Sequence, residues 1–175
     1  MSLPDPSRHM DQRNWVETVL RYIPGFRGYL EKEFRRESDS LAREWMAGRL
    51  RQGKTGLDNL MRGLVDAGQI DALPQFERVR SKLDHLTSSI LGSVNGYSGF
   101  FDFVRVDEEM LDDVYQLDAK LMEEIDRFAN HLQELGGKPE EGAKQAGDLI
   151  SQVEDLQQKQ AKRGELLRGV ERSES

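Results

Sequence analysis

The sequence predicts an all-α protein: a helical bundle of four to five amphipathic helices, arranged up-and-down, with a flexible helical arm at the C-terminal end. Apolar residues recur at intervals of three and four along most of the chain, the period of a helix with one buried face. No segment alternates apolar and polar residues over a useful strand length. Charged residues make up 33% of the chain and mean hydropathy is -0.71, as is typical of long, solvated helices.

The helices of the first half are predicted from this period and its interruptions. Residues 1–10 contain two prolines and are expected to be a disordered lead. A helix from Asp11 ends at Pro24-Gly25, and a long helix over 29–51 follows. Further helices over 57–65 and 76–94 are separated by breaks near 53–56 and 68–74. The expected apolar stripe of the long helix is Leu30, Phe34, Leu41 and Trp45.

The strongest helical pattern lies in the second half. Asp107 has the position of an N-cap, and a heptad-like seam follows it, compatible with bundle or coiled-coil packing. The seam consists of Met110, Val114, Leu117, Leu121, Ile125, Phe128, Leu132 and Leu135. Residues 11–135 are therefore predicted to form one bundle domain, and the glycine-bearing segment 136–142 a linker. The tail 143–175 has only a thin seam that ends in Gln160 and Arg163, and is expected to be a frayed helix or a disordered arm.

Composition limits the classes of function. The 175 residues suit one domain, and the chain has no cysteine, which rules out disulfides and thiol chemistry. We see neither a signal-peptide pattern nor an apolar run of membrane-span length, so a cytoplasmic location is expected. Net charge is -7, divided into +2 over residues 1–90 and -9 over 91–175. Such an acidic chain is not expected to bind nucleic acid, because phosphates repel it.

Residues 48–55, GRLRQGKT, match the letters of a phosphate-binding loop. That loop needs a preceding β-strand and a following helix, so that backbone N–H groups can surround the phosphates. Here the preceding residues SLAREWMA have a helical period, and RLRQ are good helix formers. We therefore interpret the match as a coincidence, with a helix ending in a turn at Gly53. Nucleotide binding through Lys54 ranks last among the functional hypotheses.

No other pattern indicates catalysis or a metal. The histidines, His9, His85 and His131, lack the glutamate three residues earlier that a di-iron bundle site uses. No serine or threonine stands in a nucleophile-elbow setting. We therefore predict no enzyme activity, no cofactor and no metal. The acidic residues between Asp107 and Glu124 are interpreted as the solvated face of a helix, with a patch for a basic partner as the alternative.

Two surfaces are candidates for partner binding. The first is the aromatic corner, a glycine-punctuated stretch between two long helices that contains Tyr97, Phe100, Phe101 and Phe103. Its aromatic side chains either plug the bundle or dock a partner or a lipid interface. The second is the basic turn formed by Arg49, Arg51 and Lys54. Elsewhere on the long helix, arginines alternate with acidic residues, which favours internal i, i+4 ion pairs.

Two segments of the sequence also resemble segments of other proteins. IPGFRGYLEKEFRRESD and GYSGFFDFVRVDEEMLDDVYQLDAKLM are similar to segments of uncharacterised bacterial α-helical proteins of unknown function. The resemblance covers roughly residues 22–135 and implies a bacterial, cytoplasmic, helical protein, with no activity or site residue attached.

The functional hypothesis that follows is a non-enzymatic helical interaction or scaffold protein, which acts by self-association into an oligomer or by docking a protein partner. The alternative is a peripheral membrane-surface protein that uses the aromatic corner at 97–103, although net acidity disfavours anionic lipids.

Overall fold

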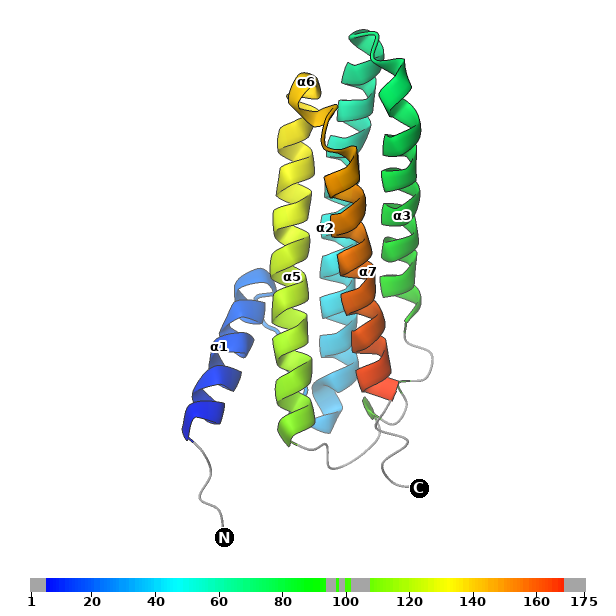
Figure 1. The fold of residues 1–175 in the computed structure, drawn as a ribbon. Coiled ribbons are helices and arrows are strands. Elements are labelled where there is room, and N and C mark those ends of the chain that lie inside the picture. The colour runs from blue at the N-terminus through cyan, green and yellow to red at the C-terminus, as the bar shows by residue number, and fades with distance from the viewer. Residues whose placement is uncertain (1–5, 94–96, 98–99, 102–107, 169–175) are drawn as a thin grey trace.

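The computed structural model describes residues 6–93, 97, 100, 101 and 108–168, and these residues confirm the all-α prediction (Figure 1). Four helices form an up-and-down bundle: α2 (Lys32–Asp66), α3 (Leu73–Gly92), α5 (Glu108–Gly136) and α7 (Ala146–Arg168). In this bundle α2 packs against α3 and α5, and α7 packs against the same two helices from the opposite corner. A fifth helix, α1 (Pro6–Tyr22), lies outside the bundle along α5.

Short elements connect the long helices. The 3-10 turn η1 (Ile70–Ala72) links α2 to α3, and the short helix α6 (Pro139–Gly142) links α5 to α7. Helix α3 has a proline in its first turn, where no backbone N–H is needed. The first turn of α5 contains Glu108 and Glu109, whose charges suit the positive end of the helix dipole. Asp107, the expected N-cap, lies outside the described residues.

The predicted break at 53–56 is wrong, because α2 is one continuous helix of 35 residues. Gly53 and Gly56 lie at a helix–helix contact and do not reverse the chain. A Cβ atom on Gly56 would lie 2.5 Å from the carbonyl oxygen of Leu132 in α5, and one on Gly53 would lie 3.1 Å from the Cα atom of Ala129. The absence of side chains at these positions lets the α2 and α5 backbones approach closely.

The expected apolar stripe of α2 is also not its core face. Leu30 precedes the helix and is 66% exposed, while Phe34, Leu41 and Trp45 are only half-buried. Trp45 lies under α1, with its ring centre 4.7 Å from that of Tyr22. The first part of α2 instead turns a mixed face toward the core, made of Arg35, Ser38, Asp39, Ala42, Arg43, Met46 and Ala47.

The C-terminal residues differ from the expected frayed or disordered arm. Residues 146–168 form α7, which packs against α3 and α5 and completes the bundle. Its thin seam is nevertheless sufficient, because Leu149, Val153 and Leu156 are buried there. Helix α1 likewise begins at Pro6, inside the segment expected to be a disordered lead. The breaks near 24–26 and 68–74 are confirmed by the ends of α1 and α2.

Candidate functional site

The described part of the aromatic corner is buried. Tyr97, Phe100 and Phe101 are at most 3% exposed, and Phe103 lies outside the described residues. Their rings contact one another, with centres 5.7 Å apart for Phe100 and Phe101 and 6.1 Å apart for Tyr97 and Phe101. Phe100 also contacts the ring of Tyr29 at 5.4 Å. These rings fill the end of the bundle, so a partner or a lipid could reach Tyr97 and Phe100 only if that end opened.

The residues of the basic turn lie on α2 and do not converge on one site. The Nε atom of Arg49 donates to Asp126 of α5 at 2.6 Å, and its Nη2 donates to Asn130. The ammonium of Lys54 lies 2.7 Å from the Asp84 carboxylate on α3, while Arg51 is exposed. Two of the three cations are therefore tied to neighbouring helices.

The phosphate-loop match lies within this stretch. Residues 48–55 are helical throughout, so their backbone N–H groups point along the α2 axis and do not surround a phosphate. The interpretation of the motif as a helix ending in a turn is wrong, because the helix continues.

A cluster of buried polar side chains lies between α2, α5 and α7. We call Tyr29, Asp39, Arg43, Asp118 and Arg163 the buried polar cluster. Arg163 of α7 has no exposed surface and donates through Nε to Asp118 of α5 at 2.6 Å. Its Nη2 donates to Asp39 of α2 at 2.8 Å and to the Tyr29 hydroxyl at 3.2 Å. Arg163 thus joins α7 to two other helices and to the turn before α2.

The acceptors of Arg163 are themselves held in place. The Tyr29 hydroxyl donates to Asp118 at 2.5 Å, and Arg43 donates through Nε to Asp39 at 2.8 Å. Arg43 is one helical turn after Asp39, so this pair is one of the i, i+4 ion pairs that the charge pattern of α2 predicted. Buried ion pairs are favourable only when further hydrogen bonds satisfy both partners, and these contacts provide such bonds to the two carboxylates.

At Arg163, burial and the neighbouring charges shift the pKa in opposite directions. Burial alone lowers the pKa of the Arg163 guanidinium, but the charges of Asp118 and Asp39, with Tyr29, raise that pKa well above its usual value. Burial and the Asp118 charge both raise the pKa of the Tyr29 phenol well above its usual value. Tyr29 is therefore a neutral donor and Arg163 a cation over the whole physiological pH range.

The turn before α2 is fixed by side chains from two helices. Tyr115 of α5 accepts the backbone N–H of Tyr29 at 2.7 Å, and Arg35 of α2 donates to the Tyr29 carbonyl at 2.7 Å. Ser38 donates to the carbonyl of Gly28 at 2.8 Å. Gly28 has a φ of 81°, and a Cβ there would collide with the Tyr115 hydroxyl. These contacts position the Tyr29 phenol in the buried polar cluster.

Sequence reasoning missed this cluster. The charge pattern places Asp118 on the solvated acidic face of its helix, yet the structure shows it fully buried. The available signal was the run of Arg35, Asp39 and Arg43 at steps of four, together with small residues on the same face. The expected seam of the tail also pointed to Gln160 and Arg163, both of which are buried.

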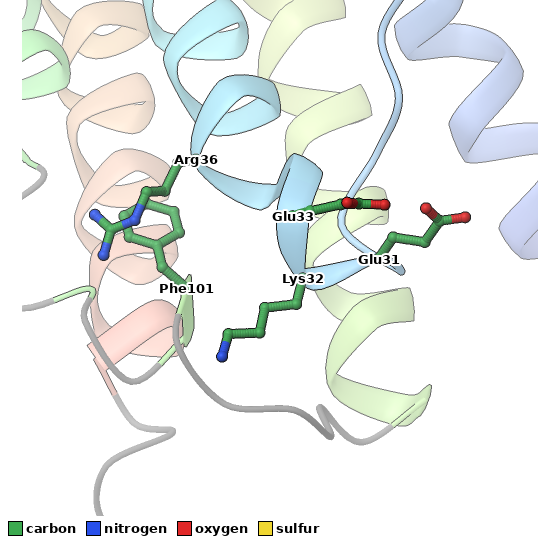
Figure 2. A pocket seen from close by; sticks show the side chains of 5 residues that line it. All are labelled: Glu31, Lys32, Glu33, Arg36 and Phe101. Atoms are coloured by element: carbon green, nitrogen blue, oxygen red, sulfur yellow. The ribbon is translucent and has the colours of Figure 1, made fainter.

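A surface hollow of about 500 Å³ lies at the start of α2, and we call it the end hollow (Figure 2). Glu31, Lys32, Glu33, Arg36 and Phe101 line it. The Arg36 guanidinium carbon lies 4.7 Å from the centre of the Phe101 ring, within the roughly 6 Å over which a cation–π contact is favourable. Phe101 is thus the one described residue of the aromatic corner that lines this hollow.

A second hollow, of about 420 Å³, lies between α5 and α7 and includes Phe128, His131 and Leu156. His131 shares a hydrogen bond of 2.8 Å with Gln145. Within the described ranges, no group of three or more His, Cys, Asp or Glu side chains is placed to hold a metal ion. Among the described helices, none combines the length and the apolar content that crossing a bilayer requires.

Comparison with protein-family models, with curated proteins and with solved structures finds no match to this chain.

Proposed function

We propose that this chain is a non-enzymatic helical interaction protein that docks a protein partner at the end hollow. The observation that supports the proposal is the composition of this end of the bundle. A hollow of about 500 Å³ combines an aromatic ring with side chains of both charges, and Leu30 beside it in the chain is 66% exposed. Interfaces commonly use such an apolar anchor surrounded by polar groups.

The apolar seams of the long helices are already buried within the chain, which favours docking at the end hollow over assembly through these seams. Val114, Leu121, Ile125 and Leu132 of the α5 seam are buried within the chain's own bundle, so they are already occupied. Leu30 is different, because most of its surface is in contact with solvent. A leucine that a partner covers would stabilise the complex by about 1.5–3 kcal/mol, which is roughly a tenfold to hundredfold change in Kd.

The chain offers a matched control for the test. Ile70 is 62% exposed and lies at the far end of α2, about 50 Å from Leu30 by the rise of the helix. Leu30→Asp and Ile70→Asp therefore place the same charge on equally exposed apolar positions at opposite ends of the bundle. Both variants should keep the far-ultraviolet circular dichroism of the wild type, since neither side chain is in the core.

The first measurement is light scattering behind size exclusion over a range of concentrations. A dimer that Leu30→Asp dissociates and Ile70→Asp leaves intact would identify a second copy as the partner. For a monomer, peptides are selected from a displayed library on the wild-type chain. We expect their Kd to rise at least tenfold with Leu30→Asp or Arg36→Ala and to stay unchanged with Ile70→Asp. A monomer for which no peptide is selected, or peptides insensitive to Leu30→Asp, would refute docking at the end hollow.

A further inference from the structure

The two halves of α7 differ in the chemistry that they bury. The first half buries Ala146, Leu149, Ile150, Val153 and Leu156, all of them apolar. The second half, residues 157–168, buries Gln160, Arg163, Gly164 and Leu167. Apolar burial stabilises without partners, whereas a buried polar group is stable only when it is hydrogen-bonded. The second half is therefore held by Arg163 and Leu167 inside the bundle, and nearer the surface by the contacts of Gln157 with the Lys82 carbonyl and of Lys159 with Glu124.

Some of the polar groups that the second half of α7 buries lack hydrogen bonds. Among the described residues, three buried polar atoms there have no hydrogen-bond partner: Nη1 of Arg163, Oε1 of Gln160 and the hydroxyl of Tyr97. Tyr97 lies against this half of the helix, since a Cβ on Gly164 would be 3.5 Å from its hydroxyl, and the Arg168 guanidinium carbon lies 5.8 Å from its ring centre. Unpaired buried polar atoms oppose the closed arrangement, because they bond to water once it opens.

The acceptors that Arg163 uses belong to a site that does not depend on α7 for its shape. Asp39 is held by Arg43, Asp118 accepts from Tyr29, and the Tyr29 backbone is fixed by Tyr115. With Arg163 withdrawn, two carboxylates would face one cation, Arg43. The planar fork of a guanidinium matches two carboxylates from different directions better than an ammonium does. The site is therefore built for an arginine side chain.

We propose that residues 157–168 are a latch over this guanidinium site. The second half of α7 undocks while the remainder of the bundle stays folded. The exposed carboxylates of Asp39 and Asp118 then accept an arginine side chain of a partner protein in place of Arg163. Opening also uncovers Tyr97 of the aromatic corner, because Gly164 and Arg168 lie against it. This surface adjoins the end hollow, because Tyr97 contacts Phe101, but the inference needs no partner in that hollow and stands without the proposed function.

Hydrogen exchange on the full wild-type chain tests the latch. Amides of residues 160–168 are expected to exchange at least tenfold faster than those of residues 149–156 of the same helix, after correction for intrinsic rates. Equal protection of both halves, or exchange of all of α7 in step with α5, would overturn the latch.

Chemical rescue of Arg163→Ala tests the ligand class. We expect the variant to speed exchange of residues 160–168 at least tenfold, and millimolar ethylguanidinium to reverse most of that change, while sodium chloride at the same concentration does not. Leu167→Ala is the control, because it removes a fully buried side chain from the same half without touching the carboxylates. Rescue of neither variant, equal rescue of both, or loss of protection throughout α5 in Arg163→Ala would contradict the proposal.

Discussion

Two glycines of α2 should respond to the same substitution with opposite signs. At Gly56, an added Cβ would lie 2.5 Å from the Leu132 carbonyl oxygen and 2.7 Å from both the Cα and the N atom of Gln133. All three are backbone atoms of α5, so the two helices have to move apart. At Gly48, in the same helix, an added Cβ meets nothing within 4 Å.

The expected magnitudes follow from these contacts. Alanine in place of glycine in a helix interior gains about 1 kcal/mol of stability through helix propensity. Gly48→Ala should show that gain in full, which raises Tm by about 2–4 °C for a chain of this size. Gly56→Ala gains the same amount but overpacks the α2–α5 contact at a cost of about 3 kcal/mol, since the atoms that must yield are rigid backbone. The net loss should be about 2 kcal/mol.

Urea unfolding followed by circular dichroism at 222 nm measures both variants. The m-value should stay unchanged, so that the shift of the midpoint reports stability. The reasoning would be refuted by a Gly56→Ala variant as stable as the wild type, since the helices would then have room that the structure denies them. Destabilisation by Gly48→Ala would equally contradict the open surroundings of that residue.

Three further predictions concern ion pairs and pH. Asp118→Asn leaves the buried Arg163 charge with one carboxylate fewer and should lower the free energy of unfolding by about 3–5 kcal/mol in urea titrations. Lys159→Met removes the partly exposed bridge to Glu124 and Asp155, and should change it by less than about 1 kcal/mol in the same titrations. The pKa of Tyr29 is raised on folding by burial and by Asp118, so the folded chain holds that proton more tightly than the unfolded chain does. Its contribution is complete below about pH 10 and is lost as pH rises further, so urea midpoints should fall above that pH, and less steeply for Tyr29→Phe. An identical slope for wild type and Tyr29→Phe would show that the phenol is not buried as described.

The same structure changes how truncation experiments should be interpreted. Removal of the chain after Leu135 would take away α7, whose Leu149, Val153 and Leu156 are buried against α3 and α5. Self-association of such a fragment would report an uncovered core and would not identify an assembly arm. Single surface substitutions such as Leu30→Asp avoid this ambiguity.

Much of the helical organisation could be predicted because it depends on local pattern. The α5 seam and the apolar face of α3 repeat at the helical period, and six of the eight expected α5 seam positions are buried, with Met110 and Leu117 half-buried. Pro24 with Gly25, and Gly68 beyond α2, end helices through backbone chemistry that acts within a few residues. The candidate site was harder to predict from the sequence. Of the expected partner-binding residues, Phe101 lines the end hollow, whereas Arg49 and Lys54 are engaged with neighbouring helices.

Residues three and four positions apart were enough to predict that the chain is helical, about where α3 and α5 begin and end, and which faces of these two helices are apolar. Only the tertiary structure decided that Gly53 and Gly56 continue a helix, since their cost is offset by the close approach of α5. It also decided that Arg163 and Asp118 belong inside. A charged side chain can be buried only where its partners meet it, and those partners come from 45 and more positions away along the chain.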